Sequence, residues 1–206
     1  ISRLQCFLSL NKKYFIKKIK KYNSSREQHI MDDMGLYTQK QITNIPVIPL
    51  IEVIPTGEYN YHVYPYLKAN DLTIEKFDYN DFYKVFDIVK YLHQRKIVHL
   101  DIKPDNFLKK GSKLYITDFE FCRKVKHTQM NLKYKCGTPN FVAPEIMDYR
   151  ICSLKSDIYS LGIMYYIMRT GDYSFKWRQS KWLSHEERYL LNKMLDKNMT
   201  HRPSIE

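Results

Sequence analysis

The stretch His99-Leu-Asp-Ile-Lys-Pro-Asp-Asn106 follows a short apolar run and places a carboxylate, an ammonium group and a carboxamide within six residues. Pro104 lies between Asp101 and Asn106 and breaks any regular helix, so this stretch is predicted to be a loop. A polar loop behind a buried strand can aim several functional groups at one point. Such loops carry function more often than cores do.

A second carboxylate lies twelve residues beyond Asn106, in Asp118-Phe-Glu120, after another short apolar run at 114–116. Mg²⁺ prefers a few hard oxygen ligands together with the phosphates of a substrate. Two carboxylates and a carboxamide that converge from two loops provide such ligands. The two stretches therefore predict a phosphoryl-transfer centre.

The composition is typical of a folded globular protein. The chain has 206 residues, of which 44% are hydrophobic and 15% aromatic, enough for one large domain or two small lobes. The longest apolar run, 163–168, is far too short to span a membrane, and we see no secretory leader. The four cysteines show no paired spacing, which predicts neither a disulfide framework nor a zinc site. We expect a reducing, intracellular compartment, either cytoplasmic or nuclear.

The formal net charge is +12. An anionic partner would explain this charge, but so would a solvated surface rich in lysine, and we favour the latter. Nucleic-acid binding has no motif behind it. Because the chain begins at Ile1 without an initiator methionine and stops at Glu206, we expect it to be truncated at both ends.

The first third of the chain is predicted to be rich in strands. Two β-like runs, 6–10 and 14–19, flank Asn11-Lys-Lys13, a plausible hairpin turn. A capping pattern, Ser24-Ser-Arg-Glu27, predicts a short helix that ends near Gly35. Further strands are expected at 45–54 and 61–64.

From about residue 71 the apolar period becomes helical. Helices are predicted around 82–92, from Ser156 to just before Gly171, and after the capping box Ser184-His-Glu-Glu187. The apolar positions expected to be buried in the last helix are 190, 191, 194 and 195. A small sheet followed by a larger helical part is the predicted α+β architecture.

Further motifs occur in a fixed order: Gly137-Thr-Pro-Asn-Phe-Val-Ala-Pro-Glu145, Ser156-Asp-Ile-Tyr-Ser-Leu-Gly162 and Arg202-Pro203. With the loop at 99–106 and Asp118-Phe-Glu120, they make the chain resemble a eukaryotic-type protein kinase domain from about residue 14 to 203. One such motif is weak evidence, but this many in order is specific. The resemblance implies a single bilobal domain, with a β-rich N-lobe at about 1–67 and a mainly helical C-lobe at about 68–206.

The resemblance implies roles for the polar residues of the two loops. Asp101 would accept or orient the proton of the substrate hydroxyl, and Lys103 would neutralise charge on the transferred phosphoryl group. Asn106 and Asp118 would hold Mg²⁺, which bridges the phosphates of ATP. Asp157 matches the buried aspartate that supports the catalytic loop.

The resemblance also implies a lysine for the nucleotide phosphates. Lys17 matches the strand lysine that contacts the α and β phosphates, and Glu27 matches the helix acid that holds it. Glu27 could instead be only the capping acid of its helix. Lys18 is a rival for Lys17, because alternation along a strand turns only one of them inward.

The remaining nucleotide contacts follow from the stretch Val63-Tyr-Pro-Tyr-Leu67, which resembles the hinge between kinase lobes. Backbone groups of Pro65 and Leu67 would contact adenine. Asp71 would reach the ribose or a basic residue of the substrate, and Leu108 would form the floor beneath the base.

The implied activity is that of a Ser/Thr protein kinase that uses ATP and Mg²⁺. Lys103, together with Thr138 before the Ala-Pro-Glu motif, resembles Ser/Thr kinases more than tyrosine kinases. Asp71 and Asp105 are acidic where kinases that prefer basic substrates are acidic, although Ile167 occupies a third such position. The alternative is a kinase-like binding protein, a pseudokinase, that acts through protein–protein interaction.

Four departures from the family pattern bear on activity. Leu100 replaces the arginine that usually pairs with a phosphate on the activation segment (118–145), so phosphorylation there is expected to matter less. Glu120 replaces a glycine that eases backbone rearrangement. No glycine precedes Gly35, so a glycine-rich phosphate loop is absent from the sequence given. Phe15 stands where a small residue usually lies above adenine, unless the strand shifts to present Lys18.

Overall fold

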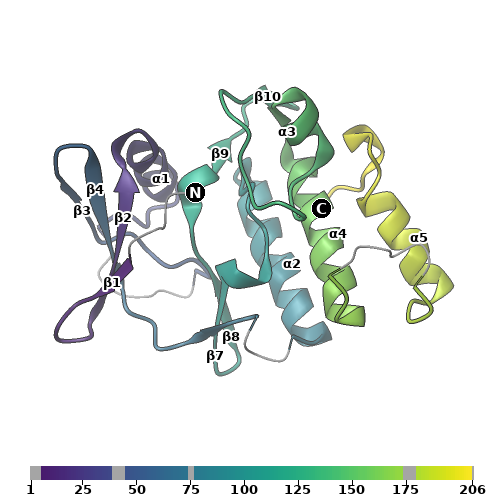
Figure 1. Ribbon diagram of the computed structural model, residues 1–206, viewed down its shortest axis with the longest axis horizontal. Coiled ribbons are helices and arrows are strands. Elements are labelled where there is room, and N and C mark those ends of the chain that lie inside the picture. The colour runs from purple at the N-terminus through teal and green to yellow at the C-terminus, as the bar shows by residue number, and fades with distance from the viewer. Residues whose placement is uncertain (1–5, 39–44, 74–76, 174–179, 206) are drawn as a thin grey trace.

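The chain folds into a small sheet-based part and a larger helical part, which lie side by side in Figure 1. The residues described in this computed structural model are 6–38, 45–73, 77–173 and 180–205. The small part contains β1 (Cys6–Leu8), β2 (Tyr14–Lys20), α1 (Lys21–Asp33), β3 (Glu52–Pro55) and β4 (Tyr59–Pro65). The larger part is built on α2 (Tyr79–Gln94), α3 (Pro144–Tyr149), α4 (Leu154–Thr170) and α5 (His185–Met194). The predicted α+β class is confirmed.

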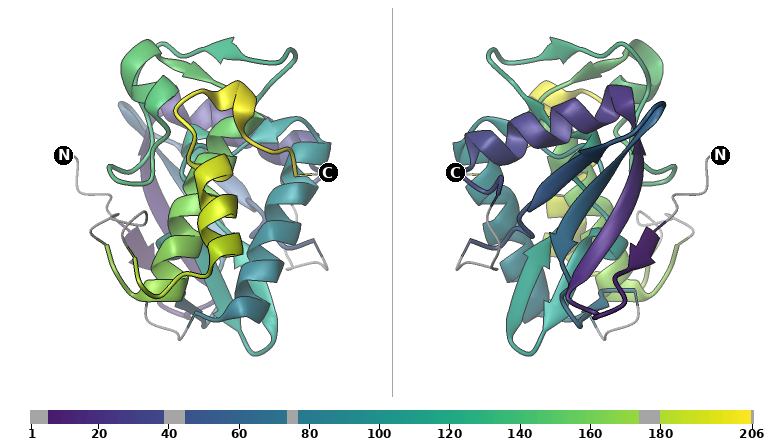
Figure 2. Two further views of the ribbon diagram at one scale, coloured as in Figure 1. Left: turned by 90° about the vertical axis from the view of Figure 1, so that its right-hand side faces the viewer. Right: turned by 90° about the vertical axis from the view of Figure 1, so that its left-hand side faces the viewer.

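The sheet of the small part has the strand order β1-β2-β4-β3, with antiparallel neighbours. Its β1–β2 hairpin is the one predicted, and α1 crosses one face of the sheet (Figure 2). In the central pair, Lys17 lies opposite His62 and Phe15 lies opposite Tyr64. Because side chains alternate along a strand, these four residues share one face. That face is the inner one, since Lys17 and His62 are buried.

Two predictions for the small part are wrong in detail. Helix α1 begins at Lys21 rather than at Ser24, and the side chain of Ser24 is buried against His62 instead of capping a helix. The expected strand at 45–54 is reduced to β3. Pro46 and Pro49 lack the N–H groups that a strand ladder needs, so the residues before β3 make only isolated bridges, at Val47 and Leu50.

The helices of the larger part are close to those predicted. Helix α4 starts at Leu154, two residues earlier than expected, because Ser153 and Ser156 form its capping box, and Gly171 ends it with a φ of +65°. Helix α5 has the predicted box of Ser184 and Glu187. Leu190 is 41% exposed, contrary to prediction, because α5 turns only one face toward α4.

Helices α4 and α5 approach each other closely at Gly162. A Cβ atom on Gly162 would lie 2.9 Å from a methyl carbon of Leu195, so a larger residue would push the helices apart. Farther along the chain, Arg202 is buried and donates to both carboxylate oxygens of Glu145, at 2.8 and 2.7 Å. This pairing fastens the segment after α5 to α3.

Three small antiparallel sheets pair segments that lie outside the four-stranded sheet. They pair β5 (Asn70–Asp71), β7 (Phe107–Lys110) and β8 (Lys113–Ile116); β6 (Ile97–Val98) with β9 (Arg123–Lys124); and β10 (Met130–Asn131) with β11 (Ile151–Cys152). Short 3₁₀ helices lie at Pro104–Asn106, Phe119–Phe121 and Met199–His201. Among the described residues, no helix is long and apolar enough to cross a membrane.

Glu187 joins three helices and gives the fold a pH dependence. Its carboxylate accepts hydrogen bonds from Arg169, from the hydroxyls of Tyr165 (2.8 Å) and Tyr79 (3.1 Å), and from the backbone N–H of Ser184 (2.7 Å). The bond from Arg169 is the main cause that lowers the pKa of Glu187 from 4.5 to about 2. The stabilisation is therefore complete above pH 4.5 and is lost as the pH falls toward 2.

We predict that Glu187→Gln lowers the free energy of unfolding by about 1 kcal/mol at pH 7, because the surface position weakens these charged hydrogen bonds. Urea unfolding of both proteins from pH 7 to pH 3 should show the difference shrinking as the pH falls. Glu52→Gln, on the exposed strand β3, is the matched control and should show no such trend. A difference independent of pH would contradict the prediction.

Candidate active site

The loop at 99–106 is anchored from below by Asp157, in the first turn of α4. The carboxylate of Asp157 is fully buried and accepts hydrogen bonds from the backbone N–H groups of His99 (2.8 Å) and Leu100 (2.9 Å). It also lies 2.9 Å from Nε2 of His93 on α2. Leu100 itself is left-handed, with a φ of +68°. Asp157 therefore fixes the backbone just before Asp101.

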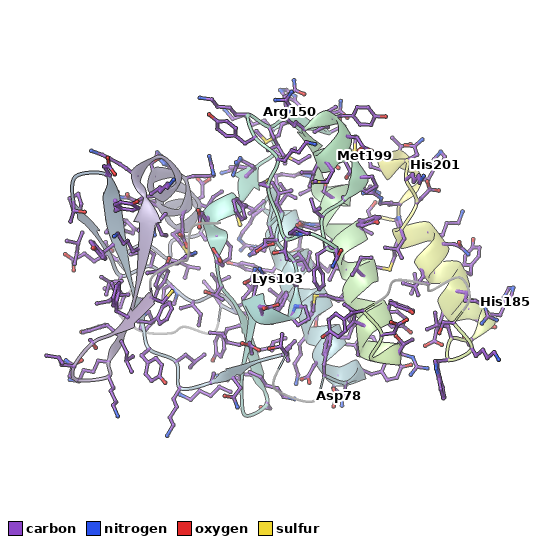
Figure 3. The ribbon with its side chains drawn as sticks, viewed as in Figure 1. Asp78, Lys103, Arg150, His185, Met199 and His201 are labelled. Carbon is purple, nitrogen blue, oxygen red and sulfur yellow. The ribbon has the colours of Figure 1, made fainter. Side chains whose placement is uncertain are left out.

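Asp101 is enclosed by donors from two segments. Its Oδ1 accepts from the backbone N–H (2.8 Å) and the hydroxyl (2.6 Å) of Thr138. Its other oxygen lies 3.1 Å from Nζ of Lys103 and 3.0 Å from Nδ2 of Asn106. Lys103 also donates to the Thr138 hydroxyl at 2.7 Å, and Figure 3 places Lys103 in the middle of the molecule. The structure thus joins Asp101, Lys103, Asn106 and Thr138 in one cluster.

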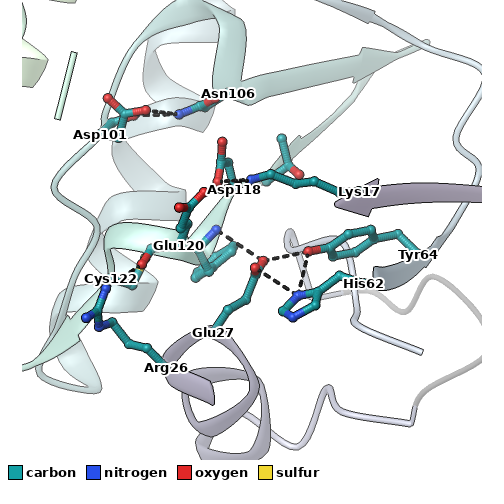
Figure 4. A network of polar contacts seen from close by, with 12 residues as sticks. Lys17, Arg26, Glu27, His62, Tyr64, Asp101, Asn106, Asp118, Glu120 and Cys122 are labelled. Carbon is teal, nitrogen blue, oxygen red and sulfur yellow. Dashed lines mark hydrogen bonds and ion pairs between the residues drawn. The ribbon is translucent and has the colours of Figure 1, made fainter. Parts of the chain in front are cut away.

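Asp118 lies beside this cluster on the neighbouring loop. Its backbone is left-handed, with a φ of +66°, and the N–H of Thr117 donates to the carbonyl of Asn106 at 3.0 Å, which joins the two loops. Lys17 donates to Asp118 Oδ1 at 2.6 Å (Figure 4). Burial raises the pKa of Asp118, but the charge and hydrogen bond of Lys17, together with the charges of His99 and Lys103, lower it overall. Asp118 is therefore a carboxylate at neutral pH.

The chemistry of Asp118 and Asn106 fits Mg²⁺. Asn106 turns its Nδ2 toward Asp101, which leaves its carboxamide oxygen as an acceptor. In the described part of the chain, no three His, Cys, Asp or Glu side chains group together to enclose a metal. Mg²⁺ does not need such a cage, because it commonly binds to one or two protein oxygens together with water and substrate phosphates.

The strand alternation turns only one of the two candidate lysines toward the site. Lys17 faces inward and is 6% exposed, whereas Nζ of Lys18 lies over the ring of Tyr59, 4.2 Å from its centroid. Burial lowers the pKa of Lys17, but the acids around it, Asp118 foremost, raise it overall, so the ammonium form is stabilised. The alternative register, which would remove Phe15 from the inner face, is not the one observed.

The expected ion pair between Lys17 and Glu27 is not formed among the described residues. The nearest carboxylates to Nζ of Lys17 are Asp118 and, at 3.4 Å, Glu120. Glu27 is fully buried and accepts from the hydroxyl of Tyr64 at 2.8 Å, and its second oxygen lies 3.1 Å from Nδ1 of His62. Glu27 is not a capping acid either, because α1 begins six residues before it.

The residues expected to surround the adenine lie where the two parts meet. Pro65 ends β4, Leu67 is buried, and Leu108 is half-buried in β7 opposite Asp71 in β5. The carboxylate of Asp71 accepts from the N–H (2.9 Å) and the hydroxyl of Thr73, which ties it into a local turn. Asp71 is therefore not poised toward a ligand in this conformation.

The roof of this region departs from the family pattern as expected. Phe15 is on the inner face of β2, with its ring 6.3 Å from that of Tyr64. The turn between β1 and β2 runs through Asn11, whose side chain accepts from the Ser9 hydroxyl and the Lys13 N–H, and it holds no glycine. The described sheet therefore presents an aromatic ring above the site and no flexible phosphate loop.

Leu100 belongs to an apolar cluster beneath the activation segment. It is 3% exposed and packs in one cluster with Leu132, Cys136 and Cys152, which are also buried. Strand β10 of the segment pairs with β11 just before α4. Hydrophobic contacts and a short sheet hold the segment where an arginine–phosphate pair commonly does so.

Sequence reasoning missed three parts of this site. The sequence indicates Thr138 only as a residue typical of Ser/Thr kinases, although its N–H and hydroxyl donate directly to Asp101. Glu120 was treated as a backbone effect and not as a partner of Lys17. His62 and Tyr64, which contact the carboxylate of Glu27, left one usable signal: they alternate on the strand predicted at 61–64, so they share one of its faces.

Restoring the common arginine tests the apolar cluster. We predict that Leu100→Arg lowers the free energy of unfolding by about 3 kcal/mol or more, because it buries an unpaired charge among apolar side chains. Leu100→Met, which keeps the volume and the apolar character, should cost less than about 1.5 kcal/mol. Urea unfolding checks both values. Equal stability of the two variants would show that a charge is accommodated there.

Comparison with known proteins agrees with this geometry. A protein of Acanthamoeba polyphaga mimivirus named "Putative serine/threonine-protein kinase" is 29% identical over 222 residues, which is 89% of this chain and 78% of that protein. A Dictyostelium discoideum protein named "Probable myosin light chain kinase" is 30% identical over 165 residues, 70% of this chain and 42% of that protein. Human Myosin light chain kinase 3 is 41% identical over 86 residues, 40% of this chain and 10% of that protein.

The sequence model of the protein kinase domain matches residues 4–206, nearly the whole chain. The match includes both loops of the site and the sheet that carries Lys17. The chain belongs to the protein kinase domain family.

Proposed function

We propose that this chain is an active Ser/Thr protein kinase, which transfers the γ-phosphate of ATP to a protein hydroxyl with Mg²⁺. The environment of Asp101 carries the proposal. Its carboxylate is 4% exposed and is oriented by Thr138, Lys103 and Asn106. Burying a carboxylate among donors is costly unless the donors are complete, and here they come from two separate segments.

The residues divide the reaction between them. Asp101 orients the attacking hydroxyl and takes up its proton, while Lys103, within 3.1 Å of Asp101, offsets negative charge on the transferred group. Asp118 and Asn106 would hold Mg²⁺, which supplies charge neutralisation across the phosphates. Lys17 would bind the phosphates nearer the nucleoside. Pro65, Leu67 and Leu108 would contact the adenine.

The proposal extends to substrate context and compartment. Asp105 is exposed beside the catalytic loop and would favour a basic residue near the phosphorylated hydroxyl, whereas Asp71 would first have to leave its turn with Thr73. We place the protein inside the cell, in cytoplasm or nucleus, because ATP is available there and its cysteines are free thiols among the described residues.

A pseudokinase is the competing candidate, and one observation favours it. Phe15 occupies the inner face above the site, where its ring would crowd an adenine. A chain selected only for protein–protein interaction, however, would be free to lose the ordered donors around Asp101.

Nucleotide binding and phosphate transfer separate the two candidates. Thermal unfolding should shift upward with ATP and Mg²⁺. Radiolabelled phosphate should appear on a generic basic protein with the unchanged chain and fall at least about a hundredfold with Asp101→Asn. Nucleotide binding without transfer in the unchanged chain would refute the enzyme proposal.

Two threonines of the activation segment should respond differently. We predict that Thr138→Val reduces phosphate transfer by about tenfold or more, because it removes the hydroxyl that joins Asp101 to Lys103. Thr138→Ser should retain most activity. Thr128→Ala should stay active, since Thr128 is exposed and Leu100 offers no site for a phosphate there. Initial rates at saturating ATP measure all three, and a large loss in Thr128→Ala would contradict the prediction.

A further inference from the structure

The acid that accompanies Lys17 has two candidates in this fold, one on α1 and one on the segment after β8. Figure 4 shows both carboxylates near the end of the Lys17 side chain. Among the carboxylates that the structure describes, only those of Glu120 and Asp118 lie within ion-pair distance of Nζ, at 3.4 and 2.6 Å. All three side chains are shielded from water to a large extent, so contact distance matters here.

Glu27 is occupied by a network that joins α1 to β4 and also to the backbone N–H of Phe119, which donates to Glu27 at 3.4 Å (Figure 4). One of its oxygens accepts from the hydroxyl of Tyr64 at 2.8 Å, and the other lies 3.1 Å from Nδ1 of His62. Nε2 of the same imidazole lies 2.6 Å from the hydroxyl of Ser24, which accepts from Asn60 at 2.8 Å. The chain of contacts runs from α1 to β4 and back, and it ties helix to sheet without Lys17.

Glu120 is held in place by the same helix through its backbone. Arg26, the neighbour of Glu27, donates to the carbonyl oxygen of Glu120 at 3.0 Å. With the backbone held in this way, the carboxylate of Glu120 lies 3.4 Å from Nζ of Lys17. A glycine at this position, as in the common family pattern, would supply no carboxylate.

We propose that Glu120, and not Glu27, is the acid that positions Lys17 in the nucleotide-bound protein. The reason is that Asp118 has two possible ligands, Lys17 and Mg²⁺. In the present structure it binds Lys17, but the proposed function requires its oxygens for Mg²⁺. Once Asp118 serves the metal, Glu120 remains as the carboxylate in contact with Lys17. Glu120 is a positioning residue in this scheme, and Glu27 keeps α1 on the sheet.

Glu27 still acts on Lys17 over a longer range. Its charge helps to raise the pKa of Lys17, together with those of Asp118 and Glu120. A titration of Lys17 would therefore mix the three acids. The discriminating measurement must depend on contact and not on the summed charge.

The test compares Glu120→Gln with Glu27→Gln, and Glu52→Gln serves as the exposed control. Affinity for a non-hydrolysable ATP analogue with Mg²⁺ is measured by calorimetry at a temperature where every variant is folded. Glu120→Gln should weaken it about tenfold or more and Glu27→Gln less than about threefold, as expected for loss and retention of one charged contact. Unfolding without ligand should show the reverse order, with Glu27→Gln lowering the Tm by about 5 °C or more.

A double-mutant cycle in the absence of nucleotide tests the contact independently of the proposed function. The Tm losses of Lys17→Met and Glu120→Gln should not add, because both remove the same contact, whereas those of Lys17→Met and Glu27→Gln should add. If the unchanged chain binds no nucleotide, the proposed function fails and this cycle alone decides the inference. Stronger coupling of Lys17 to Glu27, or a larger affinity loss in Glu27→Gln, overturns it.

Discussion

The catalytic loop of this chain depends on one buried carboxylate, Asp157. It accepts two consecutive backbone N–H groups, from His99 and Leu100, and a third contact from His93 on another helix. Left without this acceptor, two buried N–H groups would be unpaired, which is among the costliest defects in a folded protein. These bonds hold the backbone where Leu100 has a left-handed conformation. The position of Asp101 is thus determined by α4, a helix that contributes nothing else to the chemistry.

In the rest of the site, each catalytic-loop or neighbouring acid has its own hydrogen-bond donors. Asp101 takes Thr138, Lys103 and Asn106, while Asp118 takes Lys17. Each acid is therefore oriented by donors that belong to the fold itself, so the chain offsets the electrostatic cost of bringing like charges together. The Thr117–Asn106 backbone bond keeps the two groups in register. This division allows several carboxylates to lie close together, because each has its own donors.

The sequence predicted what local chemistry dictates. The capping box of Ser184 and Glu187, the loop at 99–106 and the alternation along β2 all follow from short-range rules, and all were found. Contacts between distant segments were less accessible. Ser24 is a buried partner of His62 on β4 and not a helix cap. Glu27 contacts Tyr64 and His62 and not the lysine expected from the sequence. The spacing of residues along the chain does not predict these contacts, because they depend on which side chains of distant segments meet in the fold.

The apolar cluster under the activation segment affects how the protein responds to its surroundings. Contacts among Leu100, Leu132, Cys136 and Cys152 carry no charge, so dissolved salt does not screen them and a phosphatase finds nothing there to remove. Such contacts weaken on cooling instead. A segment fixed in this way is set once, when the chain folds. At residue 100, the position of this segment therefore depends on apolar packing and not on a charge that a reversible modification could add or remove.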